Sequence, residues 1–439
     1  MPQNSGASEI SSLVSLIKTI VGAGLLGIPL AFSNDGVIVG IFILLLGAAT
    51  SGYGLFLQAY VARFVPRGHA TFFNLCSITY PALSVAFDTA IAVQCFGCAI
   101  SYLVLIGDLM PTIVASVPYV SAENYRSFWI LASTLLCVPF SFLKNLDSLK
   151  YTSVLALVAI GYLALLVVCG YFFGYVPGEL RGEVTLVPAS LRGVFSTFSI
   201  VVFAYTGHQN MFSIINEAAN SSLVSMTRLI YFAILCTSAL FILVGLAGYL
   251  TFGDKAGGNV ILLYPASWYS TLGRLAIVFM VIFLFPLMLH PARISVNNMY
   301  YWMKTNVFTV PADSPETTKA QSVSESTSLL DSTPPQSIKP SPVVPFPDST
   351  FYILTVVLLL VGNIAAITIK SFALVLAAVG ATGSTAISFI LPGMFGYSLI
   401  GSNTDEPSVH ERALKYLSLA LVVWGFLVMV VCLYSSLAL

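Results

Sequence analysis

The chain has 439 residues, of which 57% are hydrophobic and only 8% are charged. Soluble domains carry about 25% charged residues, so this composition excludes an ordinary soluble protein and indicates one that crosses a lipid bilayer repeatedly. The 18 basic and 18 acidic side chains cancel to a formal net charge of zero. This balance gives no electrostatic basis for a nucleic-acid partner.

Apolar segments near the ~20 residues needed to cross a bilayer recur along the chain and predict an all-α polytopic membrane protein with eleven transmembrane helices. The chain then divides into a short cytoplasmic N-terminus (1–9), helices one to eight (10–302), a polar loop (303–349) and helices nine to eleven (350–439). The predicted helices lie at 10–32, 37–64, 84–114, 127–143, 151–175, 193–217, 226–252, 268–292, 350–371, 372–399 and 414–437.

The first predicted helix is interrupted near its middle by three glycines and a proline within residues 18–29. In lipid every backbone amide and carbonyl needs a partner, so a helix breaks at this depth only where it faces protein or a polar cavity. The freed backbone groups therefore predict a binding site. The candidate substrate-binding residues of this break are Thr19, Gly22, Ala23, Gly24 and Leu25.

The sixth predicted helix carries a second interruption, because polar residues and glycine gather near its midpoint. Its candidate site residues are Tyr205, Thr206 and Gly207. Interruptions at matching positions of two halves indicate a transporter built from inverted repeats. Helices one to five and six to ten would form the two repeats. Since five is odd, the second repeat is inverted, and helix eleven is peripheral. The alternative is that the glycines are close contacts between packed helices.

Two such breaks suit the recognition of a zwitterion. The half-helix that begins near Gly24 presents its amides and its positive dipole end to a carboxylate. Carbonyl groups freed around Gly22 and at 205–207 accept hydrogen bonds from an ammonium group. An α-amino acid carries both groups on one carbon, so it is the predicted substrate.

Ionisable residues at bilayer depth are costly and are therefore candidates for proton coupling or gating. Lys18 precedes Gly22 by one helical turn and would place a fixed positive charge where a sodium-coupled protein binds its cation. His208 lies in the second break, and an unperturbed imidazole titrates near neutral pH, which suits proton coupling. Glu217 and Asp88 are further candidates. The alternatives are a snorkelling lysine, a structural histidine and solvated helix ends.

The loop at 303–349 is rich in Ser, Thr and Pro and is predicted to be disordered. Within it, Glu325, Leu329 and Leu330 have the spacing of an acidic dileucine sorting signal, which a cytosolic sorting adaptor would bind, or they match that spacing by chance. Eleven basic residues against six favour a cytoplasmic N-terminus and loop, and hence a lumenal C-terminus. The signal favours an endosomal, lysosomal or vacuolar membrane.

Four stretches of the chain resemble the amino acid/auxin permease family, and within it the fungal-type vacuolar amino acid transporters. They are residues 18–29, 97–108, 203–217 and 380–392. The resemblance implies a core of the amino acid-polyamine-organocation type, with a 5+5 inverted repeat, broken helices one and six, and one extra helix. It also implies secondary active transport of amino acids.

The resemblance gives several single residues a meaning. Proton-coupled relatives commonly carry a lysine at the position of Lys18, whereas sodium-coupled relatives carry an asparagine. Gly207 is a departure, because many relatives have a cysteine there. The resemblance also places Ser101 and Tyr102 in the pocket that reads the substrate side chain.

The sequence therefore predicts a proton-coupled, sodium-independent transporter of neutral, possibly acidic, amino acids in a vacuolar or lysosomal membrane, working by alternating access. Its partners are the amino acid, protons and the lipid bilayer, and no cofactor is expected. The alternatives are an amino acid-sensing receptor and a plasma-membrane permease. An enzyme is not expected, since the sequence has no metal-binding or nucleophile constellation.

Overall fold

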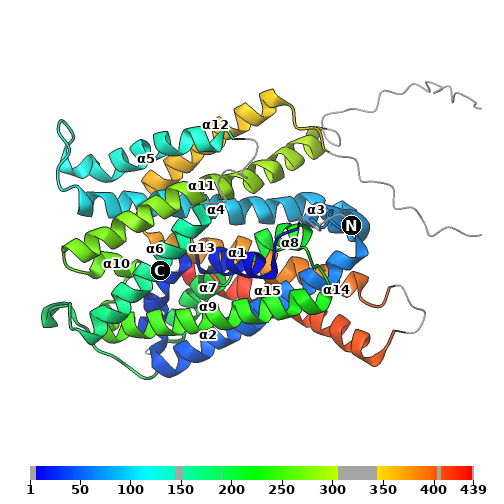
Figure 1. Ribbon diagram of the computed structural model, residues 1–439, viewed down its shortest axis with the longest axis horizontal. Coiled ribbons are helices and arrows are strands. Elements are labelled where there is room, and N and C mark those ends of the chain that lie inside the picture. The colour runs from blue at the N-terminus through cyan, green and yellow to red at the C-terminus, as the bar shows by residue number, and fades with distance from the viewer. Residues whose placement is uncertain (1–5, 144–151, 189, 305–343, 403–406, 438–439) are drawn as a thin grey trace, which may run out of the picture.

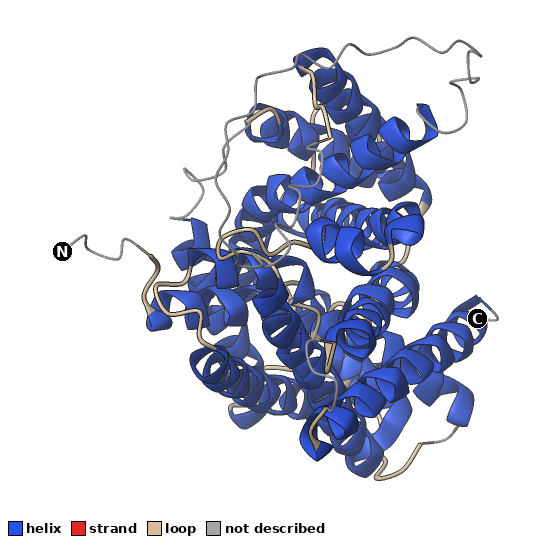
Figure 2. Ribbon diagram, turned by 90° about the vertical axis from the view of Figure 1, so that its right-hand side faces the viewer, coloured by secondary structure: helices blue, strands red, loops and turns tan. Residues whose placement is uncertain are grey.

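The computed structural model describes residues 6–143, 152–188, 190–304, 344–402 and 407–437. Helices and connecting loops make up this part of the chain (Figure 2), with one isolated β-bridge, between Ala7 and Ala218. The α-helices are α1 (Glu9–Val21), α2 (Ile28–Val61), α3 (Phe72–Thr79), α4 (Ser84–Ile113), α5 (Tyr125–Ser141), α6 (Thr152–Phe172), α7 (Leu191–Ala204), α8 (His208–Glu217), α9 (Leu223–Phe252), α10 (Val260–Leu263), α11 (Trp268–Met303), α12 (Asp348–Thr368), α13 (Phe372–Val379), α14 (Leu391–Leu399) and α15 (Val409–Leu437).

Eight helical stretches of the described chain are long and apolar enough to cross a bilayer, which confirms a polytopic, all-helical membrane protein. The remaining predicted segments form shorter helices. Helix α1 has 13 residues, α5 has 17, and the predicted sixth helix consists of α7 with 14 residues and α8 with 10. The short helices include the halves of the two predicted broken helices.

Helix α2 contains the turn that separates the first and second predicted helices. Gly36 has a φ of +71°, a left-handed conformation that favours glycine. A Cβ atom here would lie 2.7 Å from the backbone nitrogen of Val187. The Val37 amide donates to the Thr185 carbonyl at 3.1 Å. The segment from Gly24 to Asp35 is thus a half-helix of its own, called here the second half of helix one.

The helices form two groups with the broken helices between them (Figure 1). Helices α4, α5, α11 and α12 lie along one side, and α2 and α9 lie along the other. Helices α1, α7, α8 and α13 occupy the space between these groups. The interrupted segments are therefore surrounded by protein, as unpaired backbone groups in a membrane require.

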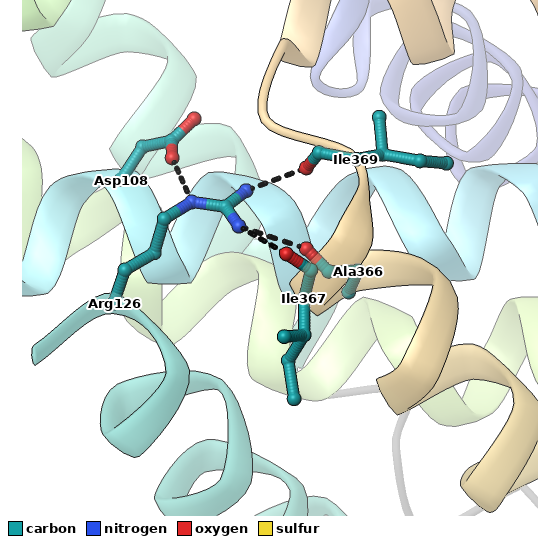
Figure 3. Close-up of polar contacts among 5 residues, drawn as sticks. All are labelled: Asp108, Arg126, Ala366, Ile367 and Ile369. Carbon is teal, nitrogen blue, oxygen red and sulfur yellow. Dashed lines mark hydrogen bonds and ion pairs between the residues drawn. The ribbon is translucent and has the colours of Figure 1, made fainter. Parts of the chain in front are cut away.

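Arg126 of α5 forms hydrogen bonds with α4 and with the end of α12 (Figure 3). The Arg126 Nε donates to Asp108 Oδ1 at 2.8 Å, which joins α5 to α4. Its other guanidinium nitrogens donate to the carbonyl oxygens of Ala366, Ile367 and Ile369 at 2.8–3.3 Å. These carbonyls end α12 and have no partner further along that helix, so the arginine caps it.

We expect Arg126→Met to lower the free energy of unfolding by about 2–4 kcal/mol, because it leaves Asp108 and three carbonyls without their donor. Thermal unfolding of the purified protein in detergent would measure the loss. Lys370→Ala, which removes an exposed cation just beyond the same cluster, is the matched control. A change of equal size in both variants would contradict the role given to Arg126.

Helix α11 runs to Met303, well beyond the predicted end at residue 292. The helix continues past the predicted crossing because Arg293 is buried in protein contacts. Its side chain is 1% exposed and donates to the Ser141 carbonyl at 2.9 Å and to Thr355 Oγ1 at 2.7 Å. The neighbouring His290 lies 3.1 Å from the same guanidinium group. Buried polar contacts thus hold the helix past this point.

Candidate functional site

The first helix breaks at the predicted glycines. Helix α1 ends at Val21, and Gly22 takes a φ of +36° while its amide donates to the Lys18 carbonyl at 3.3 Å. A short 3-10 helix, Gly24–Gly27, then leads into α2. The second break separates α7 from α8 and spans residues 205–207.

The two breaks lie against each other. A Cβ atom on Gly24 would lie 2.7 Å from the Cα of Ala204, and one on Gly207 would lie 2.6 Å from Ile20 Cγ1. Either side chain would force the half-helices apart. Glycine at these two positions therefore allows the close contact between the helices, whereas the left-handed conformation at the first break belongs to Gly22.

A cavity opens where the breaks meet. Residues of α1 and α8 form one side of it, and residues of α4 and α11 form the other. Its wall consists of Lys18, Thr19, Ile20, Gly22, Ala23, Gly24, Gln94, Cys98, Tyr102, Phe203, Thr206, Gln209, Asn210, Leu284, Leu287 and Met288. Asn210 Nδ2 donates to Thr19 Oγ1 at 3.2 Å and so links the two broken helices within this wall.

Six of the ten predicted substrate-binding residues line the cavity: Thr19, Gly22, Ala23, Gly24, Tyr102 and Thr206. The other four lie behind its wall. The Ser101 hydroxyl donates to the Cys98 carbonyl at 2.7 Å, and the Tyr205 hydroxyl donates to Ser238 Oγ at 2.9 Å. Leu25 is fully buried, and Gly207 faces Ile20.

The candidate coupling residues are spread over the molecule. Lys18 lines the cavity. His208 begins α8 but is buried on the side facing α2, where its Nε2 lies 2.8 Å from the Cβ position of Gly54. A histidine in the break can point to either side of the helix, and spacing along the chain does not indicate which. The structure therefore brings Lys18, and not His208, to the cavity.

Two acidic candidates lie away from the cavity. Glu217 is exposed at the end of α8, where its backbone carbonyl accepts from the Ala7 amide at 2.8 Å. Asp88 is buried between α4 and α11 and accepts from Asn298 Nδ2 at 3.1 Å. The proposed sorting signal at Glu325, Leu329 and Leu330 lies outside the described residues.

Gln94 is a cavity residue that the sequence analysis missed. It is 1% exposed and its Oε1 accepts from Ser384 Oγ at 2.6 Å, while its Nε2 lies 3.3 Å from Cys98 Sγ. Ser384 belongs to a π-helical stretch, Gly380–Ser384, which was also not predicted. An uncharged amide deep in an apolar segment was the available signal, because such groups need a partner in lipid.

Two broken helices that meet at a partly polar cavity inside a helical membrane protein define the class of secondary transporters. The comparison with protein families agrees, since residues 5–438 match the family described as transmembrane amino acid transporter protein. The chain belongs to this family. It is thus an amino acid transporter and a multi-pass membrane protein, and not an enzyme.

Curated relatives match nearly the whole chain. Vacuolar amino acid transporter 7 of Saccharomyces cerevisiae is 38% identical over 98% of both chains. Vacuolar amino acid transporter 6 of the same yeast is 39% identical over 99% of both. A more distant relative, sodium-coupled neutral amino acid transporter 7 of Danio rerio, is 23% identical over 68% of this chain and 66% of its own. The resemblance seen in the sequence is confirmed.

Proposed function

We propose that this protein moves neutral amino acids, with acidic ones as a second candidate class, across a vacuolar or lysosomal membrane, with proton coupling and without sodium. The observation that carries this proposal is the cavity formed by the two helix breaks with Lys18 in its wall. The near full-length similarity to two yeast proteins named as vacuolar transporters supports the proposed vacuolar location.

The cavity supplies both halves of a zwitterion site. Gly22, Ala23 and Gly24 lie in its wall, at the point where the second half of helix one begins. The N-terminal end of that half-helix carries partial positive charge and suits the substrate carboxylate. The Thr206 hydroxyl donates to the Val202 carbonyl at 2.7 Å and lies 3.5 Å from Ser388 Oγ, so its oxygen retains an acceptor position for the ammonium group.

Lys18 carries the argument for sodium independence. Lys18 is part of the cavity wall, where its positive charge would disfavour a bound cation, and a charge of this kind is costly at bilayer depth unless it has a role. The relative from Danio rerio, which is named as sodium-coupled, is the more distant one. We therefore assign the coupling role to protons.

The transport cycle we propose is alternating access with eleven crossings. Helices one to five and six to ten form two inverted repeats, and the eight long helices are completed by α5, by α1 with the second half of helix one, and by α7 with α8. With the N-terminus in the cytoplasm, the lining residues of α1 and α8 lie on the cytoplasmic side of the two breaks. Rocking of one group of helices against the other would expose the cavity to the lumen.

Purified protein in liposomes tests this function. We expect labelled neutral amino acids to accumulate under an imposed pH gradient and to exchange against internal amino acid. Replacing sodium by choline should leave the rate unchanged. Strong sodium dependence would contradict the proposal for Lys18. Saturable binding without accumulation or exchange would indicate an amino acid receptor, and location at the cell surface would indicate a plasma-membrane permease.

A further inference from the structure

A buried carboxyl group lies at the far end of the second half of helix one. Asp35 is 0% exposed. This half-helix runs beside α7 in the opposite direction, because its start at Gly24 touches Ala204 and its end at Asp35 reaches Thr197. The residue is connected to the substrate cavity through one short, continuous helix, since Gly24 lines that cavity.

The hydrogen bonds around Asp35 fit the neutral acid. Thr197 Oγ1 lies 2.9 Å from Asp35 Oδ1 and 2.9 Å from the Gly193 carbonyl oxygen. A hydroxyl has one hydrogen, so it cannot donate to both. When Asp35 carries a proton on Oδ1, it donates to Thr197, which then donates to Gly193, and each hydroxyl hydrogen has one acceptor.

The second carboxyl oxygen strengthens this reading. Asp35 Oδ2 has no hydrogen-bond partner among the described residues. In a carboxylate this oxygen would share the negative charge, and a buried charge without a partner is strongly unfavourable. In the neutral acid it is a carbonyl oxygen, for which the missing bond costs far less. Both oxygens are therefore consistent with a bound proton.

No cation compensates a charge on Asp35 in the described part of the chain. The titratable groups on the surrounding helices are Arg192 at the start of α7 and Tyr249 on α9. The loops near the turn at Gly36 add Arg181 and Glu183, which precede α7, and Asp254 and Lys255, which follow α9. The Tyr249 hydroxyl is engaged with Thr185, and Asp254 accepts from the Glu183 amide at 3.0 Å. None of these groups forms an ion pair or hydrogen bond with Asp35 in that part of the chain.

We propose that Asp35 is a proton-binding site of this transporter. With its proton bound, it holds the second half of helix one against α7, as in this structure. Loss of the proton places a charge in this contact and loosens the half-helix whose other end lines the cavity. Substrate binding and proton occupancy are thereby linked through one rigid element. This inference rests on the proposed function as a proton-coupled transporter.

Infrared spectroscopy of the purified protein tests the bound proton directly and without transport. Near pH 6, the wild type should show the carbonyl stretching band of a protonated carboxyl group that Asp35→Asn lacks. Thr197→Val should keep this band but shift its frequency, because the acceptor of the proton is gone. Asp254→Asn, which changes an exposed aspartate near the same turn, should leave the band unchanged. Identical bands in the wild type and Asp35→Asn, or an unshifted band in Thr197→Val, would overturn the proposal.

Exchange of labelled amino acid in liposomes then tests the link to transport. The exchange rate of the wild type should change between about pH 5 and 8. We expect this change to be at least about threefold smaller in Asp35→Asn, because the amide cannot lose a proton. Asp254→Asn should keep the wild-type profile. An unaltered profile in Asp35→Asn would overturn this link, whereas absence of exchange in the wild type would contradict the proposed function itself.

Discussion

Lys18→Ala is expected to abolish proton-driven accumulation of amino acids, with a loss of at least about 100-fold in the initial rate. Lys18 lies in the wall of the cavity, one helical turn before the glycine at which α1 ends. The alanine removes the charge that, in the proposed cycle, stands where a coupling cation would bind, and a 100-fold loss of rate corresponds to about 2.7 kcal/mol in activation free energy. Uptake into liposomes under an imposed pH gradient is the measurement.

The matched control for this variant is Lys255→Ala. Lys255 is exposed and donates to the Glu179 carbonyl at 2.8 Å, away from the cavity. It should retain wild-type uptake. Lys18→Arg keeps the charge and should retain part of the activity. If Lys18→Ala still accumulated substrate with the pH gradient at the wild-type rate, the lysine would have no part in coupling.

Gln94→Leu should raise the KM for the transported amino acid by about 10- to 100-fold, with a smaller effect on the maximal rate. The leucine keeps most of the side-chain volume but removes an amide from the cavity wall and leaves the Ser384 hydroxyl without its acceptor. Loss of a hydrogen bond to a bound substrate, together with a buried group left unpaired, has an effect of this order. Concentration dependence of uptake gives both constants.

Two further variants separate binding from folding. Ser384→Ala removes only the hydroxyl that orients the Gln94 amide, so its KM should rise less than in Gln94→Leu. Thr112→Val changes another polar residue of α4, whose hydroxyl donates to the Leu109 carbonyl at 2.7 Å, and should leave the KM unchanged. Equal effects of Gln94→Leu and Thr112→Val would indicate general damage to α4.

The helices and their breaks could be predicted because a membrane places demands on each stretch of chain separately. Apolar length alone located the helices, since every crossing needs about 20 apolar residues. The break at Gly22 was predictable because glycine and proline weaken a helix wherever they occur. The break before His208 was predictable for the same reason and because polar side chains gather there.

Contacts between distant segments could not be predicted in this way. The tenth predicted helix carries small and polar residues at 380–385, but nothing in their order shows that Ser384 of the π-helical part donates to Gln94 of α4, 290 positions away in the sequence. Arg293 lies one residue past the predicted crossing at 268–292, but it is buried against α5 and α12. The position of each of these two side chains depends on which hydrogen-bond acceptors other helices place near it.

The class of the protein, the approximate position of its helices, the two breaks and the residues around them follow from the order of residues along the chain. Which faces of those helices meet depends on their packing, and this packing brings Lys18 and Gln94 to the cavity while His208, Ser101 and Tyr205 lie outside its lining. A helix break is a property of the local backbone. A cavity wall is set by the rotation of each helix about its axis, and this rotation is fixed by packing against its neighbours.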